Sequence, residues 1–131
     1  MRVNVGDVVL CEYRNFDGEV KQGIFIVVFH DSIDKPISNN FTALKISSKP
    51  YLYQLKLERN YLPFLDRDSW VNCNNVFRFR EDKVIAIIGR LTVYYKNKVL
   101  QQMINYNNRM VESMRNSIGV ENLFEEVANE Q

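Results

Sequence analysis

The chain has 131 residues, enough for one domain with a single substantial hydrophobic core. Hydrophobic residues make up 46% and charged residues 25% of it, which is ordinary for a soluble globular protein. The formal net charge of +1 neither indicates nor excludes a nucleic-acid partner, because a neutral total can hide a local basic face. No run approaches the ~20 apolar residues of a membrane-spanning helix, and the first residues lack the apolar region of a signal peptide. We therefore expect a cytoplasmic protein with no membrane contact.

Strand patterns fill the first half of the chain. Four strands are predicted, at residues 8–13, 23–29, 41–47 and 51–58. Asp17-Gly18 supplies turn chemistry after the first of them. The second is an unbroken apolar and β-branched run, which indicates a central strand buried on both faces. The fourth alternates between apolar and polar residues and therefore predicts a half-exposed strand.

The second half changes from strand to helix. Two short strands are predicted at 70–71 and 76–80, separated by a turn at 73–75, and residues 84–88 form a buried segment that is either strand or helical turn. From about residue 96 to 118, apolar residues recur at the spacing of one helix face. They are Leu100, Ile104, Val111, Met114 and Ile118. Gly119 is a plausible stop for this helix, and the acidic tail 120–131 is either frayed or a cover for a basic groove.

This order of elements predicts the fold class. Five to seven short strands followed by one helix indicate a mainly β (α+β) protein, with a small, strongly bent antiparallel sheet that closes toward a barrel and a C-terminal α-helix. The absence of strand–helix–strand alternation argues against a parallel α/β fold. We expect one domain over residues 1–119, followed by the tail. Cys11 and Cys73 lie in strand-like segments and predict buried apolar positions rather than a disulfide, a zinc site or any cofactor site.

Several short motifs resemble the PemK/MazF family of toxin-type endoribonucleases over roughly residues 5–118. The opening Gly6-Asp7-Val8-Val9-Leu10 is similar to that family's glycine–aspartate–apolar first strand. Later matches to its pattern are Ser69, Val71, Cys73, Asn75 in the place of a glutamine, Lys83-Val84 in the place of arginine–leucine, Ile88-Gly89 and Leu91. The resemblance implies an SH3-like β-barrel with a C-terminal helix, commonly a homodimer, that cuts single-stranded RNA without a metal. It also implies an antitoxin protein as a partner.

The same resemblance implies where the cleavage site lies. Family members use the RNA 2′-hydroxyl as nucleophile, with an arginine before a proline at the head of the second strand and a hydroxyl residue at the end of the third. Here these positions hold Gln22-Gly23 and Ser47. Gln22 donates a hydrogen bond but carries no charge for the developing phosphate anion, and losing one such stabiliser typically costs about 10²–10³ in rate. Lys21 is a cation one residue earlier, but alternation places it on the opposite strand face from Gln22.

Other residues are candidates for RNA binding. Arg78 and Arg80 share one strand face, Lys83 follows closely, and Lys56 lies on another exposed face. These cations would meet phosphates while Tyr51, Tyr53 or Tyr61 stack on bases; a merely solvated sheet face is the alternative. His30, the sole histidine, is either a general acid or base near RNA or a surface-loop residue.

Two functions therefore remain open from the sequence. One is a metal-independent endoribonuclease, active or slowed, with Ser47 and either Gln22 or Lys21 at the cleavage site. The other is a catalytically inactive barrel of the same ancestry that binds RNA or a protein partner. The missing arginine favours the second, whereas Ser47 and the strand architecture favour the first.

Overall fold

The computed structural model describes residues 2–50 and 54–118, without the side chains of Asn74, residues 109–111 and residues 113–118. Predictions for Tyr51, Tyr53, the tail 120–131 and the distal helix face (Val111, Met114 and Ile118) lie outside the described residues or side chains, as does the boundary at residue 119.

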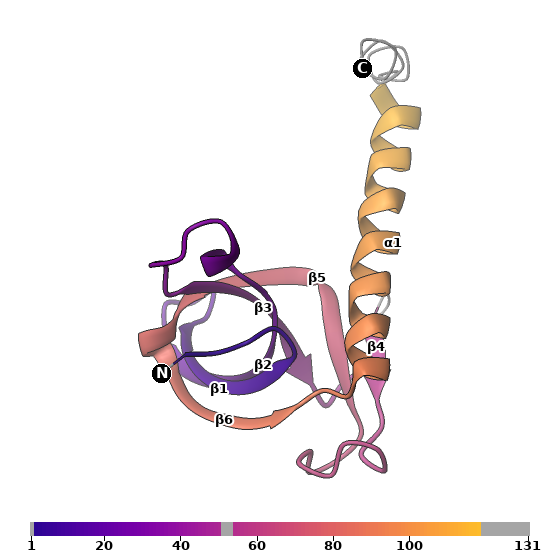
Figure 1. The fold of residues 1–131 in the computed structure, drawn as a ribbon. Coiled ribbons are helices and arrows are strands. Elements are labelled where there is room, and N and C mark those ends of the chain that lie inside the picture. The colour runs from indigo at the N-terminus through magenta and orange to yellow at the C-terminus, as the bar shows by residue number, and fades with distance from the viewer. Residues whose placement is uncertain (1, 51–53, 119–131) are drawn as a thin grey trace.

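One antiparallel sheet of six strands forms the body of the protein. The strands are β1 (Asp7–Arg14), β2 (Val20–His30), β3 (Asn40–Ser47), β4 (Gln54–Leu57), β5 (Ser69–Arg80) and β6 (Val84–Arg90). Their order in the sheet is β4-β5-β3-β2-β1-β6, and Figure 1 shows the sheet curling into a ring with the helix α1 (Val93–Ile118) beside it. Two short 3₁₀ helices, η1 (Asp31–Ile33) and η2 (Glu81–Lys83), join β2 to β3 and β5 to β6. The predicted α+β fold, bent sheet and C-terminal helix are confirmed.

The middle of β2 is buried on both faces of the sheet over residues 25–28, as its apolar run predicts. Ile26 and Val28 belong to one apolar cluster and Phe25 and Val27 to another, because successive side chains along a strand point to opposite faces. The second cluster is rich in aromatic rings. Phe25 packs edge-on against both Phe77 and Phe79, with ring centroids 5.1 and 4.8 Å away. The first cluster extends to the connection after β4 and to the start of α1.

Several local predictions need correction. The two short strands predicted at 70–71 and 76–80 are one strand, β5, and the turn predicted at 73–75 is an irregularity within it. Between the pairs Leu44–Val76 and Ile46–Val71, β3 has one residue and β5 has four, so the extra residues bulge without ending the strand. Residues 84–88 form strand β6, one of the two structures expected for them, but they are half-buried or exposed rather than buried. The helix α1 begins at Val93 rather than near residue 96.

The helix is anchored at its beginning. The Thr92 hydroxyl accepts a hydrogen bond from the Tyr95 N–H at 3.3 Å, and the Tyr95 and Val99 side chains are buried in the first cluster. Figure 1 shows the rest of α1 rising beyond the sheet. Within the described ranges, no helix is both long and apolar enough to cross a membrane.

Candidate functional site

The end of β3 opens into a cavity of about 520 Å³, here called the Ser47 cavity. Its lining includes three serines, Ser47, Ser48 and Ser69, together with Asp66 and Arg67. Its walls are apolar and come from four parts of the chain. They are Ile24 of β2, Ile46 of β3, Phe64 and Leu65 of the connection 58–68, and Ile88 of β6. The predicted hydroxyl residue therefore shares one hollow with a cation and a carboxylate.

Ser47 takes part in a local turn as well as lining this cavity. Its Oγ accepts a hydrogen bond from the Lys49 N–H at 3.1 Å, which is the contact of a serine in a turn. That contact uses only an acceptor lone pair of the hydroxyl. The hydroxyl proton remains available to donate to an anion in the cavity.

Arg67 and Asp66 are placed by the connection 58–68, which packs closely despite having no regular structure. The Arg59 N–H donates to Asp68 Oδ1 at 2.9 Å, and Arg59 Nε donates to the Leu65 carbonyl at 3.1 Å. Leu65 is buried, while Asp66 and Arg67 are exposed. Among the residues that the structure describes, the Arg67 guanidinium forms no ion pair, so its charge is available to a ligand.

Gln22 and Lys21 are both exposed near the start of β2, and their faces differ as alternation predicts. Gln22 shares a face with Ile24, which lines the Ser47 cavity and lies about 6.6 Å further along the strand. Lys21 points to the other face and pairs in register with Tyr13 of β1. Neither side chain lines the Ser47 cavity itself.

The predicted RNA-binding arginines lie elsewhere. Arg78, Arg80 and Lys83 line a separate cavity of about 430 Å³, the arginine cavity, with Arg14 and the ring of Phe77. Two of these cations already have carboxylate partners. Arg78 Nη2 is 2.6 Å from Asp31 Oδ2, and Arg80 pairs with Asp82 two residues later.

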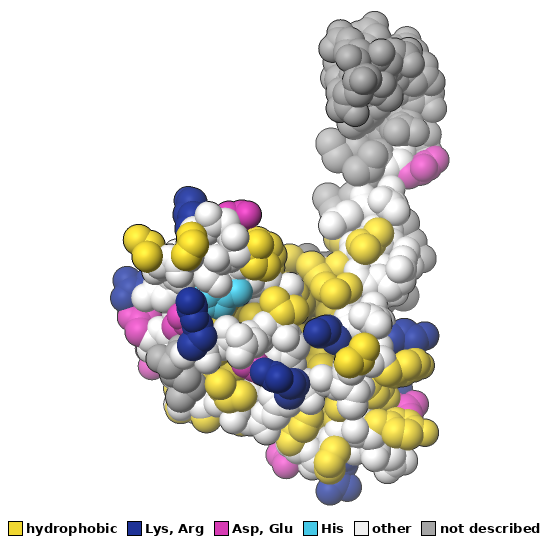
Figure 2. Space-filling view, viewed as in Figure 1, with side chains coloured by type: hydrophobic (Ala, Val, Ile, Leu, Met, Phe, Trp, Pro, Cys, Tyr) yellow, Lys and Arg dark blue, Asp and Glu magenta, His cyan; other side chains and the backbone are white. Residues whose placement is uncertain are grey.

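These ion pairs have electrostatic consequences. The hydrogen bond from Arg78 holds the pKa of the Asp31 carboxyl below its ordinary value, and Arg80 does the same for the pKa of Asp82. The structure thus gathers three predicted cations but not around Ser47. Lys56 lies apart from them, 3.6 Å from Asp68 Oδ2. Figure 2 accordingly shows Lys and Arg side chains at separate places on one face, rather than one continuous basic patch.

His30 is not a surface-loop residue, so that expectation is wrong. It ends β2 with only 4% exposure, and its Nδ1 accepts a hydrogen bond from the Ser32 N–H at 3.1 Å. Its Nε2 lies 3.3 Å from Oε2 of buried Glu81, which also accepts a 2.7 Å hydrogen bond from the Val3 N–H. These contacts join the N-terminal segment to both 3₁₀ helices. They give His30 a structural environment in which it lines none of the three cavities.

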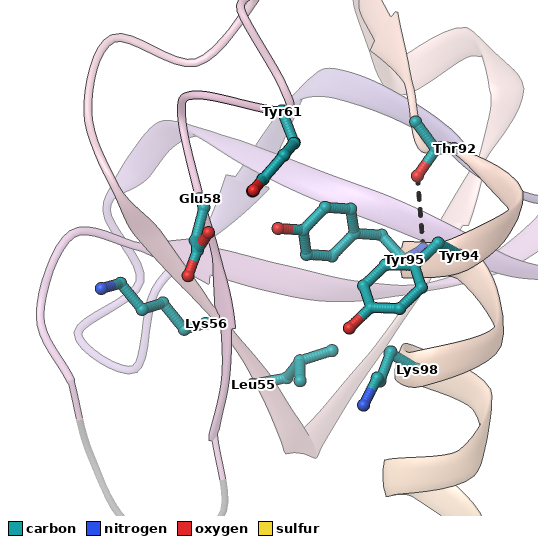
Figure 3. Close-up of a pocket in the computed structure, with 8 residues that line it drawn as sticks. All are labelled: Leu55, Lys56, Glu58, Tyr61, Thr92, Tyr94, Tyr95 and Lys98. Carbon is teal, nitrogen blue, oxygen red and sulfur yellow. Dashed lines mark hydrogen bonds between the residues drawn. The ribbon is translucent and has the colours of Figure 1, made fainter.

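A third cavity, the tyrosine cavity, lies between β4 and the first turns of α1 and has a volume of about 680 Å³. Figure 3 shows its side chains: Leu55, Lys56, Glu58, Tyr61, Thr92, Tyr94, Tyr95 and Lys98. Of these, the sequence singled out Tyr61 and Lys56 for RNA contact.

The bent six-stranded sheet with its C-terminal helix is the PemK/MazF-like fold, and comparison with solved structures bears this out. The Mycobacterium tuberculosis toxin MazF-mt6 matches with a TM-score of 0.62 and 14% identity, over 78% of this chain and 96% of that one. An endoribonuclease solved in complex with its cognate antitoxin, from a mycobacterial species, matches with a TM-score of 0.58 and 14% identity, over 79% and 90%. No family model matches the sequence, and no curated protein sequence matches it. The likeness is one of fold.

Proposed function

We propose that this protein is a toxin-type endoribonuclease that cleaves single-stranded RNA at the Ser47 cavity without a metal ion. The observation that carries the proposal is the meeting of Ser47, Asp66 and Arg67 around one hollow in a MazF-like fold. The family resemblance implies an arginine at position 22, where this chain has Gln22. In this proposal Arg67 provides the positive charge that such an arginine would supply. Arg67 lines the Ser47 cavity from the connection 58–68, whereas position 22 lies on the strand face beside it.

The chemistry requires one bond to form and one to break. The 2′-hydroxyl oxygen attacks the adjacent phosphorus, the P–O5′ bond breaks, and the products are a 2′,3′-cyclic phosphate and a 5′-hydroxyl. Asp66 takes the proton from the 2′-hydroxyl as general base, and water protonates the leaving oxygen. Arg67 holds the negative charge that builds on the phosphate oxygens, with the Ser47 hydroxyl donating a further hydrogen bond. Gln22 lies on the same strand face as the cavity wall and contacts the neighbouring nucleotide.

The test is cleavage of a mixed single-stranded RNA with EDTA present. We expect wild-type protein to yield cyclic-phosphate ends, and Arg67→Ala and Ser47→Ala each to lower the rate, Arg67→Ala by about 10²–10³. Arg67→Lys should restore only part of the rate, because an ammonium lacks the two-point fork of a guanidinium. Lys35→Ala is the matched control, since it removes an exposed cation from the β2–β3 connection.

A rescue variant tests whether it is the guanidinium charge of Arg67 that speeds cleavage. In the Arg67→Ala background, Gln22→Arg returns a guanidinium to the strand face that leads into the cavity, so the rate should recover in part. Full activity of Arg67→Ala would refute the role of Arg67. Intact RNA at concentrations where dimer is verified would refute the enzyme and favour the alternative, an inactive barrel that binds RNA or a protein partner.

The partners belong to the same proposal. One fold neighbour was solved with its cognate antitoxin, which supports an antitoxin partner for this chain as well. We propose a homodimer in the cytoplasm as the working form. Sedimentation of the purified protein alone, and then with the product of any adjacent reading frame, tests both points.

A further inference from the structure

The tyrosine cavity has the residue types that hold a nucleotide, and the cleavage proposal does not use it. Tyr61 and Tyr94 line it with 65% and 62% of their surface exposed. Its volume of about 680 Å³ lies within the range of about 300–1,000 Å³ that small-ligand sites occupy. Exposed aromatic rings beside a cavity offer flat faces on which an unstacked base can stack.

The ring of Tyr94 is held in place before any ligand arrives. It packs edge-on against Tyr95, with centroids 5.2 Å apart and an interplanar angle of 87°. Tyr95 is itself buried, and its N–H is fixed by Thr92, as the dashed line in Figure 3 shows. Burial also raises the pKa of the Tyr95 hydroxyl, so this group stays neutral at the cavity wall. A ring that is ordered in advance loses little entropy on stacking.

Cationic charge accompanies these rings. Lys98 Nζ lies 5.4 Å from the centroid of the Tyr94 ring, and Figure 3 shows both side chains on the helix side of the cavity. Within the part of the chain that the structure describes, Lys98 forms no ion pair, and the first turn of α1 has no acidic residue. The carboxylate that lines the cavity, Glu58, comes from the connection after β4, across from the helix (Figure 3), so the helix side is the cationic side of the cavity. A phosphate next to a stacked base would therefore meet an available ammonium.

The connection 58–68 ties this cavity to the cleavage site. Tyr61 near its start lines the tyrosine cavity, and Asp66 and Arg67 near its end line the Ser47 cavity. We propose that the tyrosine cavity holds one unstacked nucleotide of the single-stranded RNA outside the scissile step, with its base on Tyr94 and Tyr61 and its phosphate on Lys98. This inference rests on the proposed function for the identity of the ligand.

Binding of an RNA that cannot be cleaved separates the two proposals. The probe is a fluorescein-labelled, fully 2′-O-methylated 12-mer of mixed sequence, and the readout is fluorescence anisotropy. Tyr94→Ala and Tyr61→Ala should each weaken binding about 5- to 150-fold, the factor that follows from about 1–3 kcal/mol per stacked base. Tyr94→Phe keeps the ring and should bind like wild type. Because both tyrosines are exposed, the variants should keep the wild-type melting temperature.

The phosphate contact has its own signature. Lys98→Ala should lower the slope of log affinity against log salt by about 0.7, the value for one phosphate contact on a single strand, and Lys35→Ala should leave the slope unchanged. Wild-type affinity in all three alanine variants, Tyr94→Ala, Tyr61→Ala and Lys98→Ala, would overturn the inference while leaving cleavage intact. Loss of binding in these variants of a protein that cleaves nothing would support the inference and refute only the enzyme.

Two further outcomes would also overturn the inference. One is a wild-type protein that does not bind the 12-mer at all. The other is a glutamate-rich 12-residue peptide that binds more tightly than the RNA and depends on Lys98, because that result would assign the cavity to a protein partner.

Discussion

Gly89 in β6 allows the connection 58–68 to lie against the sheet. A Cβ atom built on Gly89 would lie 2.5 Å from Cγ and Cδ1 of the Phe64 ring, closer than real Cβ atoms come to other atoms. Phe64 is half-buried and is flanked in sequence by buried Leu62 and Leu65. The ring therefore has little freedom to move away, and we predict that Gly89→Ala displaces the connection.

The expected cost is that of overpacking a well-fitted contact, about 1–3 kcal/mol in the free energy of unfolding. With a urea dependence of about 1–3 kcal/mol per molar for a small domain, a 2 kcal/mol loss moves the midpoint by roughly 1 M. Arg67 lies three residues after Phe64 on the same connection, so the variant should also lose cleavage activity at urea-free, fully folded conditions. Equilibrium urea unfolding and the cleavage assay measure the two effects separately.

A double-mutant cycle isolates the contact. Phe64→Leu removes the ring that Gly89→Ala would strike, so the two changes together should cost at least 0.5 kcal/mol less than their sum. Gly18→Ala is the matched control, because Gly18 has φ +82° with no atom near its Cβ position. It should cost about 1–2 kcal/mol through backbone strain alone and add to Phe64→Leu without coupling. A Gly89→Ala variant as stable as wild type, or one without coupling to Phe64, would refute this account of the packing.

Three further outcomes follow from single contacts. Glu81→Ala should lower the unfolding free energy by about 1–3 kcal/mol in urea titrations, because it leaves a buried backbone N–H without its acceptor; unchanged stability would contradict this. Arg78→Ala should raise the pKa of Asp31 toward its ordinary value in an NMR titration, since the Arg78 hydrogen bond lowers it. The wild-type pair stabilises the fold at neutral pH and loses that effect as pH falls through the lowered pKa. Burial raises the thiol pKa of Cys11 to about 12 and of Cys73 to about 11, so iodoacetamide at pH 8 should label neither until urea unfolds the protein.

The fold was largely predictable because its strands follow from local pattern. The apolar run in β2 and the Asp17-Gly18 turn specify a buried strand after a hairpin, and both are present. Residues 73–75 predict a turn because Cys-Asn-Asn has turn chemistry. The β5 residues before and after them nevertheless pair with β3 and β4, so the strand continues through them. Pairing with β3 and β4 is a tertiary effect, which local propensity does not contain.

The proposed site was less predictable than the fold. Ser47 ends a predicted strand, and the family resemblance alone marked it. Arg67 carried no local signal, because the run Asp66-Arg67-Asp68 has the composition of an ordinary exposed connection. His30 shows the opposite case: it follows a buried run and precedes polar residues, but its partner Glu81 lies 51 residues later in the chain.

The proposed exchange of Gln22 for Arg67 follows from how electrostatic stabilisation works. A guanidinium lowers the barrier according to its position relative to the phosphate, whichever segment of the backbone supplies it. Arg67 lines the Ser47 cavity, and position 22 lies outside it on the same face of β2 as Ile24, which does line it. An arginine side chain is long, so we expect Gln22→Arg to bring its guanidinium to the mouth of that cavity. A guanidinium on the connection 58–68 moves away from the phosphate when that connection shifts. A guanidinium on a central strand keeps its position. Activity that depends on Arg67 should therefore be sensitive to the Phe64–Gly89 contact, and activity restored through Gln22→Arg should not.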